Sequence, residues 1–174
     1  MKLLSVVFSF RNEESNLIEL VKRTSAAIKK LSNWTFELIF VNDDSNDSSE
    51  TILTDLQKSY PIKIVNMSRR FGVGPCVLAG LNIAKGDAIV YMDSDLQDPP
   101  EIIPELIKKY EEGYDVVHTR RTKRMGESKL KLFITKSAYK IINKLLRGLD
   151  KYLGIDWLRF PFLDVFNYLS LIHI

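Results

Sequence analysis

The chain has 174 residues, of which 45% are hydrophobic and 27% are charged, and it carries a formal net charge of +3 at pH 7. These values are typical of one globular domain and exclude a chain that is disordered as a whole. The single cysteine, Cys76, excludes an internal disulfide and is typical of a reducing, cytoplasmic setting. No apolar run reaches the roughly 18 residues of a membrane-spanning helix, and the apolar residues 1–10 predict a buried strand rather than a signal peptide.

Short apolar runs alternate with segments of helical periodicity along the chain. Strands are expected at residues 3–10, 36–41, 62–67, 87–92 and 114–118. Helices are expected at residues 17–31, from residue 48 or 49 to 56, around residues 77–81 with an end at Gly86, from the proline pair 99–100 to 110, and over 130–146. This order predicts an α/β fold with a mostly parallel sheet flanked by helices.

Polar clusters follow the first four predicted strands, and they begin at Arg11, Asn42, Ser68 and Asp93. Parallel strands bring their carboxyl ends to one edge of a sheet, and α/β proteins bind their ligands beyond that edge. We therefore expect the four clusters to meet at one ligand site.

The sharpest pair in these clusters is Asp93 and Asp95, separated by one residue at the end of a buried strand. Close carboxylates repel one another unless a cation lies between them. Oxygen ligands suit Mg²⁺ or Mn²⁺, and such an ion can neutralise a diphosphate leaving group. An Asp-x-Asp pair is common, and a solvated turn with helix-capping acids is the alternative interpretation.

Two other clusters allow both a functional and a structural interpretation. Asp43 can accept hydrogen bonds from a nucleobase or a ribose, whereas Asp47 or Ser48 can cap the next helix. Arg69 is suited to binding phosphate, or else it is a solvated surface residue. The glycines that follow lack the spacing of a dinucleotide-binding fingerprint, which argues against a nicotinamide enzyme.

A basic block lies between residues 120 and 147, where ten Lys or Arg residues accompany a single acid, Glu127. Together with the apolar stripe of the predicted helix, this charge is compatible with a membrane surface as the partner, contacted through a basic helix at residues 127–148. The alternative is a helix whose apolar face packs on the core and whose charged face is exposed to solvent. The block lacks interleaved aromatic residues and a known reading motif, so no nucleic acid partner is expected.

In combination, these motifs resemble family 2 glycosyltransferases with the GT-A fold, a Rossmann-like α/β arrangement. The similarity is to the polyprenyl-phosphate branch, which includes dolichol-phosphate mannosyltransferases and bactoprenol glucosyltransferases. The stretch most specific to this branch runs from Asp93-Ser94-Asp95-Leu96-Gln97-Asp98 to Pro99-Pro100-Glu101. All matching stretches are residues 5–14, 36–47, 68–72, 79–81 and 86–101.

The resemblance implies that Glu13 and Asp43 contact the nucleoside of the donor. Arg69 and Asp93 complete the expected set of four donor-binding residues. The implied reaction is an inverting transfer of a hexose from a nucleotide-sugar, with UDP or GDP as the nucleotide. The implied acceptor is a polyprenyl phosphate, undecaprenyl or dolichyl, which places the protein in the cytoplasm, at the cytoplasmic face of a membrane.

The resemblance also implies a metal site and a catalytic pair. Asp93, Asp95 and Gln97 would hold Mg²⁺ or Mn²⁺ together with the donor diphosphate. Arg120, after the fifth predicted strand, would face a phosphate of the donor or of the acceptor. The expected catalytic residues are therefore Asp95 and Arg120.

The chain departs from the usual family pattern at several positions. Ser9-Phe10-Arg11 stand where the family usually has Pro-Ala-Tyr or Pro-Val-Tyr before its Asn-Glu. Asp44 stands where glycine is usual, and Arg70 where asparagine is usual. These departures concern the donor contacts and leave the expected fold unchanged.

The resemblance fades beyond the basic block. We therefore expect a nucleotide-sugar-binding glycosyltransferase domain at residues 1–148 and a divergent or truncated tail at residues 149–174. Two alternatives stay open: a non-catalytic nucleotide-sugar-binding remnant, and a glycosyltransferase that acts on a saccharide acceptor. A nucleotidyltransferase is disfavoured, because its glycine-rich loop would fall where this chain has Arg11-Asn12-Glu13-Glu14.

Overall fold

Residues 1–119 and 170–173 are described by the structure, a computed structural model. The elements are β1 (Lys2–Phe10), α1 (Leu17–Ile28), β2 (Trp34–Asn42), α2 (Ser49–Leu56), β3 (Ile62–Asn66), α3 (Val73–Ile83), β4 (Ala88–Asp93), the 3₁₀ turn η1 (Pro100–Ile102), α4 (Ile103–Glu111), β5 (Val116–His118) and β6 (Ser170–His173). The predicted basic helix at residues 127–148, Arg120 and the predicted division at residue 148 lie outside the described residues.

The described strands form one sheet in the order β3-β2-β1-β4-β6-β5. The pairs β1–β2, β1–β4 and β2–β3 are parallel, whereas β6 pairs antiparallel with both β4 and β5. The α/β fold with a mostly parallel sheet is thus confirmed. The strand β6 was not expected, and it lies between two strands that precede it by more than fifty residues.

The register of the sheet aligns the carboxyl ends of three strands. Ser9 of β1 lies opposite Val41 of β2 on one side and Asp93 of β4 on the other. Phe10, the last residue of β1, lies opposite Asn42, the last residue of β2. The polar clusters that follow these strands therefore start from one edge of the sheet, as expected.

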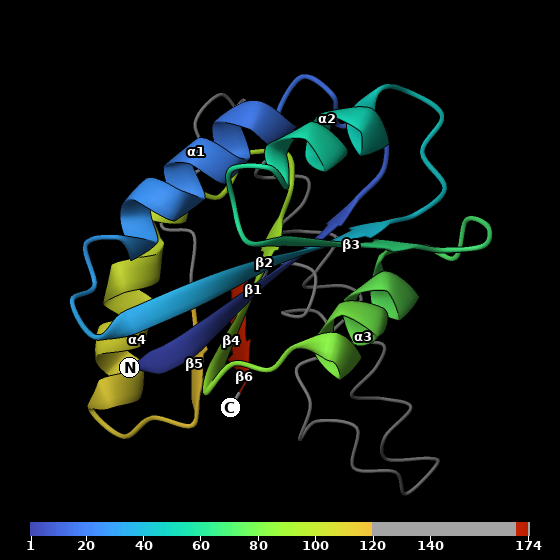
Figure 1. The fold of residues 1–174 in the computed structure, drawn as a ribbon. Helices are drawn as coiled ribbons and strands as arrows, with labels where there is room; N and C mark the ends of the chain where they lie inside the picture. Colours follow the sequence, from blue (N-terminus) through green and yellow to red (C-terminus); the bar gives the residue numbers. More distant parts are fainter. Residues whose placement is uncertain (120–169, 174) are drawn as a thin grey trace, which may run out of the picture. The chain divides into compact units, whose positions relative to one another are not determined.

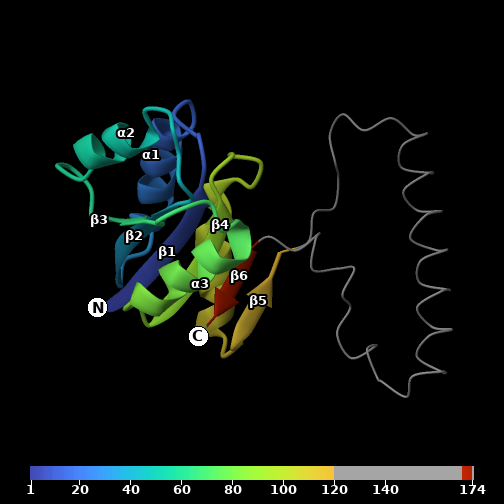
Figure 2. The same cartoon turned by 90° about the vertical axis from the view of Figure 1, so that its right-hand side faces the viewer.

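Helices cover both faces of the sheet (Figures 1 and 2), with α1, α2 and α4 on one face and α3 on the other. Alternate residues of β1 divide accordingly: Leu4, Val6 and Phe8 belong to the core under α1 and α4, and Val7 belongs to the smaller core under α3. Burial on both sides explains why these strands are nearly continuous apolar runs. Within residues 1–119 and 170–173, no helix combines the length and apolar character needed to cross a membrane.

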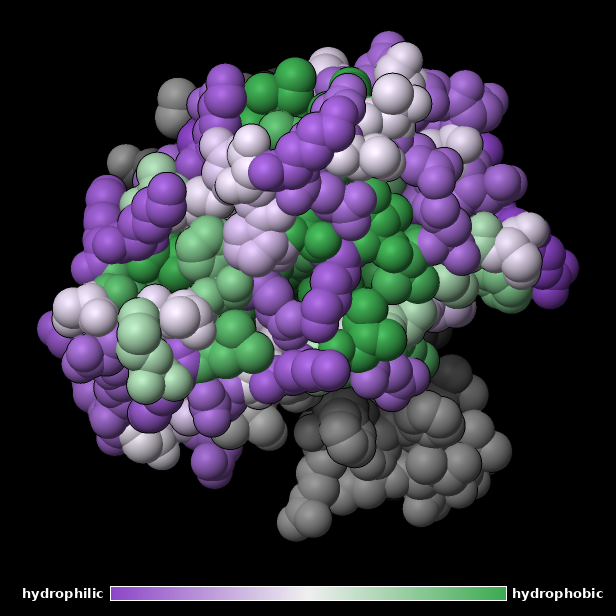
Figure 3. Space-filling view, in the orientation of Figure 1, coloured by the Kyte–Doolittle hydropathy of each residue, from purple (hydrophilic) through white to green (hydrophobic). Residues whose placement is uncertain are grey.

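The helix α3 differs from its prediction. Its buried residues are Cys76 and Gly80, whereas the apolar Leu78 is 62% exposed. Apolar surface is accordingly visible over α3 in Figure 3. The helix ends at Ile83 because Ala84 adopts an extended backbone, so Gly86 does not end it.

Gly80 sets the distance between α3 and the sheet. A Cβ atom at this position would collide with the side chain of Val7 and would lie 3.2 Å from Val41 Cγ2. Because glycine has no side chain, the helix can approach β1 and β2 closely at this point. The close approach brings the first turn of α3 to the carboxyl edge of the sheet.

Candidate active site

The loops after β1, β2 and β4 share an unusual backbone conformation. Asn12, Asp44 and Leu96 have positive φ angles of 56°, 60° and 60°. Asn and Asp tolerate this left-handed region well, whereas a leucine adopts it at a cost, on the order of 1–3 kcal/mol. Such strain is concentrated at functional sites, and Leu96 lies directly after the Asp93–Asp95 pair.

The loops after β1 and β2 are tied together by hydrogen bonds. The Asn12 N–H donates to Ser45 Oγ at 3.0 Å, and Asn12 Oδ1 accepts from the Asn46 N–H at 2.9 Å. Asp47 Oδ2 accepts from the Glu14 N–H, and Asp47 Oδ1 accepts from the Ser49 N–H at the start of α2. Asp47 is therefore structural, in agreement with the capping interpretation of this cluster.

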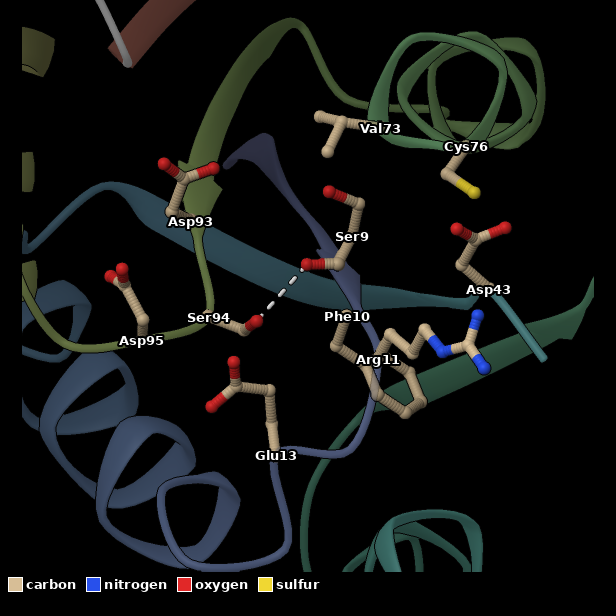
Figure 4. Close-up of a pocket in the computed structure, with 10 residues that line it drawn as sticks. All are labelled: Ser9, Phe10, Arg11, Glu13, Asp43, Val73, Cys76, Asp93, Ser94 and Asp95. Carbon is tan, nitrogen blue, oxygen red and sulfur yellow. Dashed lines mark hydrogen bonds between the residues drawn. The ribbon is translucent and has the colours of Figure 1, made fainter. Parts of the chain in front are cut away.

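A cavity of about 290 Å³ lies at this edge of the sheet (Figure 4). Its walls come from the ends of β1 and β4, from the loops after β1, β2 and β4, and from the first turn of α3. The residues that line it are Ser9, Phe10, Arg11, Glu13, Asp43, Val73, Cys76, Asp93, Ser94 and Asp95. In Figure 4, Asp43, Cys76 and Arg11 lie at one end and Asp93 and Asp95 at the other.

Asp43 is an ionised carboxylate held by the backbone. It is only 7% exposed, and its two oxygens accept from the N–H groups of Phe71 at 2.6 Å and Gly72 at 3.0 Å. Burial by itself would raise the pKa of Asp43, but these two hydrogen bonds, together with the Cys76 thiol and the charge of Arg11, outweigh it and lower that pKa. A fixed negative charge therefore lies at one end of the cavity.

Cys76 faces Asp43 and remains a thiol. Burial, reinforced by the charge of Asp43 and a hydrogen bond to it, raises the pKa of Cys76 to about 11. The thiolate is the nucleophilic form of cysteine, so this residue lines the wall and performs no covalent chemistry near neutral pH. Its side chain is free and buried.

Arg11 brings a positive charge to the same end of the cavity. Its Nη1 atom is buried and has no hydrogen-bond partner among the described residues. The guanidinium lies beside the Phe10 ring and below Asp43 in Figure 4. A buried guanidinium donor without an acceptor is costly, on the order of 1–3 kcal/mol, which favours a small adjustment that lets the side chain meet an acceptor on a bound ligand.

Asp93 and Asp95 are half-buried carboxylates that accept hydrogen bonds from different groups. Asp93 Oδ1 accepts a hydrogen bond from the Tyr91 hydroxyl at 2.8 Å. Asp95 Oδ1 accepts from the Gln97 N–H at 3.0 Å, within the tight turn at Leu96. Between the two acids, Ser94 is buried and donates to the carbonyl oxygen of Ser9 at 3.0 Å, which ties this loop to β1.

The donor set at this end of the cavity fits a hard divalent cation. Across residues 1–119 and 170–173, no group of three or more His, Cys, Asp or Glu side chains is arranged to hold a metal ion. Mg²⁺ is commonly bound by one or two carboxylates, with the phosphates of a substrate completing its coordination. Asp93 and Asp95 supply such a pair, and a diphosphate in the cavity would supply the remaining oxygens.

Residues 5–160 match the sequence profile of the family described as Glycosyl transferase family 2. The chain belongs to this family. An uncharacterized glycosyltransferase of Synechocystis sp. is 44% identical over 143 residues, which cover 82% of this chain and 45% of that protein. The family prediction is therefore confirmed.

Two further relatives of this family 2 chain are named for lipid carriers. The undecaprenyl-phosphate 4-deoxy-4-formamido-L-arabinose transferase of Photorhabdus laumondii is 42% identical over 84% of this chain and 44% of its own length. A prophage bactoprenol glucosyl transferase homolog of Escherichia coli is 38% identical over 83% of this chain and 47% of its own length. These names bear out the resemblance to the polyprenyl-phosphate branch. The chain spans about half the length of the curated relatives it matches.

Solved structures share the fold of this family 2 chain. Staphylococcus aureus TarS 1–349 in complex with UDP-GlcNAc has a TM-score of 0.58 at 23% identity and covers 74% of this chain and 36% of its own. The mannosyltransferase PcManGT of Pyrobaculum calidifontis, in complex with GDP-Man and Mn²⁺, has a TM-score of 0.52 at 19% identity and covers 70% of this chain and 35% of its own. The GT-A fold is thus confirmed.

The structure brings together four of the predicted site residues, Glu13, Asp43, Asp93 and Asp95, which all line the cavity. Two others do not line it. Arg69 is exposed and places its guanidinium over the Phe71 ring, 4.7 Å from the centroid, and Gln97 is exposed on the loop after β4. Arg120 lies outside the described residues.

Sequence analysis missed several residues of the cavity and its support. Ser9 and Cys76 line the wall, and the Tyr91 hydroxyl donates a hydrogen bond to Asp93. Arg11, which also lines the wall, belongs to a polar cluster that was expected at this site. The two-residue period of a strand could have found Tyr91, because it lies on the same side of β4 as Asp93. No sequence signal marks Cys76, which reaches Asp43 only through the packing of α3 on the sheet.

Proposed function

We propose that this chain forms the donor-binding part of an inverting glycosyltransferase that transfers a sugar, a hexose in the simplest case, from a nucleotide-sugar to a polyprenyl phosphate. The observation that carries the proposal is the cavity itself. It has a backbone-anchored carboxylate, Asp43, at one end and a carboxylate pair, Asp93 and Asp95, at the other, and we assign the first end to the nucleoside of the donor and the second to its diphosphate.

Each end of the cavity suits one part of such a donor. Asp43 can accept hydrogen bonds from a nucleobase N–H or from ribose hydroxyls, and Arg11 can donate to a base carbonyl or stack on the base. Glu13, whose Oε2 accepts from Asn16 Nδ2 at 2.6 Å, also lines the cavity, and we assign it to the nucleoside of the donor. Donor complexes of the fold relatives with UDP-GlcNAc and with GDP-Man support this assignment, with either nucleotide as the candidate.

At the end of the cavity that holds Asp93 and Asp95, the interaction with the donor diphosphate would be electrostatic. Asp93 and Asp95 would hold Mg²⁺ or Mn²⁺, and the ion when bound neutralises the charge that develops on the leaving diphosphate. The Mn²⁺ complex of PcManGT supports a divalent ion in this fold. Gln97 and Arg69, on neighbouring loops, and Arg120 are the further residues we assign to phosphate contact.

The acceptor needs little activation by the protein. A lipid phosphate is already anionic near neutral pH, so no strong general base is required for its attack on the anomeric carbon. The task of the chain is then to position the two substrates and to stabilise charge. The names of the Photorhabdus and Escherichia relatives support a polyprenyl acceptor, and we place the enzyme in the cytoplasm, at the cytoplasmic face of a membrane, contacted through residues 127–148.

Calorimetric titration of the 174-residue chain with UDP-sugars and GDP-sugars, with and without Mn²⁺, tests the donor site. We expect metal-dependent binding of one nucleotide, with the affinity lost after chelation by EDTA and in the Asp95→Asn variant. An exposed acid in the loop after β2 provides the control, because Asp44→Asn should bind as the wild type does. A folded chain that binds neither nucleotide would refute the proposal.

The acceptor is tested separately by transfer of radiolabelled sugar to undecaprenyl phosphate and to soluble saccharides. We expect a lipid-linked product of inverted anomeric configuration. Transfer only to saccharides would favour the saccharide acceptor, whereas donor binding without any transfer would favour a non-catalytic binding remnant.

A further inference from the structure

A chain of hydroxyl groups runs beneath the carboxylate pair. Ser9 Oγ lies 3.1 Å from the Tyr91 hydroxyl, and the Tyr91 hydroxyl lies 2.8 Å from Asp93 Oδ1. Both hydroxyl-bearing residues are buried, with Tyr91 4% exposed. The register places Ser9 directly opposite Asp93, so β1 and β4 hold the three groups in a fixed relation.

The direction of these hydrogen bonds follows from the donor inventory. An ionised carboxylate can only accept, so the single proton of the Tyr91 hydroxyl goes to Asp93. Ser9 must then donate to the Tyr91 oxygen, and the chain runs from Ser9 through Tyr91 to Asp93.

A second contact of Ser9 holds Ser94, the residue between the two acids. Its backbone carbonyl accepts from Ser94 Oγ at 3.0 Å, so Ser9 contacts the β4 end both through Tyr91 and through Ser94 (Figure 4). Ser94 lies between the two acids and is itself buried. Ser9 therefore links β1 to the segment that carries both carboxylates.

We propose that Tyr91, itself held by Ser9, is a positioning residue that orients the Asp93 carboxylate for the metal–diphosphate of the donor. The inference rests on the proposed function. A side chain that hydrogen-bonds a metal ligand from outside fixes its orientation, and its loss typically lowers metal affinity by about 10-fold to 100-fold. Tyr91 itself does not line the cavity.

The Tyr91→Phe variant of the 174-residue chain removes the hydroxyl and keeps the ring. Mn²⁺ affinity is measured by electron paramagnetic resonance in the presence of the nucleotide-sugar bound by the wild type, and nucleoside binding is measured by calorimetry without metal. We expect the Mn²⁺ affinity to fall by roughly 10-fold, with donor binding restored at raised Mn²⁺ concentration. Nucleoside binding without metal should not change.

Tyr110→Phe is the matched control, because this tyrosine packs on Trp34 away from the cavity and should leave the Mn²⁺ affinity unchanged. Ser9→Ala is the second variant, and it is expected to lower the Mn²⁺ affinity less than Tyr91→Phe does. It also serves if Tyr91→Phe fails to fold, because an unchanged Mn²⁺ affinity in Ser9→Ala would then refute the positioning role.

The outcomes separate this inference from the proposed function. If the wild type binds no nucleotide-sugar, the proposed function fails and the positioning role fails with it. If the wild type binds in a metal-dependent manner, Asp93→Asn abolishes that binding and Tyr91→Phe matches the wild type, only the positioning role is overturned. An equal loss of metal-dependent and metal-free binding in Tyr91→Phe would show a merely structural residue and would also overturn it.

Discussion

Asp43 combines features that make it the most constrained carboxylate of the site. Its oxygens accept two backbone N–H groups, it faces the buried Cys76 thiol, and the charge of Arg11 lies nearby. The sequence offered Asp43 as a nucleoside contact only beside a structural alternative. Its place on the cavity wall, with a lowered pKa, favours the nucleoside contact.

Replacing Asp43 by asparagine should weaken nucleotide-sugar binding by at least about 10-fold, because hydrogen bonds to a charged group contribute roughly 1.5–3 kcal/mol each. The amide would also direct an N–H group toward the N–H of Phe71 or Gly72, so we expect a lower melting temperature. Calorimetric titration below the melting temperature of the variant measures the first effect. Unchanged affinity in a folded variant would contradict the assignment of Asp43 to the nucleoside.

Ser9 and Arg11 depart from the usual family sequence, and the structure shows which groups they contact. In the sequence, both depart from the family pattern before Asn12 and Glu13, and Arg11 also begins the first polar cluster. In the fold, Ser9 contacts the Tyr91 hydroxyl that binds Asp93, and Arg11 brings to the Asp43 end of the cavity a buried nitrogen that has no partner among residues 1–119 and 170–173. Residue type alone could not reveal these roles, because both depend on which strand lies beside β1.

Among the elements, α3 contributes to the site through its distance from the sheet. Gly80 permits the close approach, and the first turn of α3 then brings Val73 and Cys76 to the cavity wall. The apolar residues of this segment predicted a helix but not the face that it buries, and in the structure Leu78 is exposed. A helix that is apolar all round gives no period from which to choose a face.

We expect Gly80→Ala to destabilise the protein by about 1–3 kcal/mol, because the added methyl group overpacks the contact with Val7 and Val41. The same change should weaken nucleotide-sugar binding, because α3 must move away from Asp43. Gly74→Ala is the control within the same helix, since nothing lies within 4 Å of a Cβ atom there. Urea denaturation should show no loss of stability for Gly74→Ala, and equal losses in the two variants would contradict the close-approach argument.

At the scale of the whole molecule, Glu37 joins several elements at the end of the sheet opposite the cavity. Its Oε1 accepts from Ser5 Oγ at 2.6 Å and from the Lys85 N–H at 2.9 Å, and its Oε2 pairs with Lys63 Nζ at 2.5 Å. Burial by itself would raise the pKa of Glu37, but these partners outweigh it and lower the pKa. The residue thus connects β1, β2, β3 and the segment before β4.

This network predicts a dependence of stability on pH. A carboxylate whose pKa is lowered by folding stabilises the protein above its ordinary pKa, about 4 for glutamate, and loses that contribution as the pH falls through the lowered pKa. Glu37→Gln should therefore be less stable than the wild type at pH 7 by about 1–3 kcal/mol, and the difference should shrink at acid pH. Urea midpoints between pH 7 and pH 3 measure this, with exposed Glu105→Gln as the control. A difference independent of pH would contradict the role of the charge.

The sequence by itself determined the alternation of strands and helices, the parallel core of the sheet and the motifs of the family. These features depend on local periodicity and on residue types that a single segment carries, such as the acids directly after β4. The same local logic placed Glu13, Asp43, Asp93 and Asp95 at one edge of the sheet, because parallel strands end together.

Only the tertiary structure decided the insertion of β6 between β4 and β5, the buried face of α3 and the partners of Ser9, Tyr91 and Cys76. Four residues of β6 contain no signal for a partner strand more than fifty residues away, since pairing is set by register and packing rather than by local sequence. The hydrogen bonds around Asp43 and Asp93 likewise join residues distant in the chain. Their chemistry exists only once the sheet has formed.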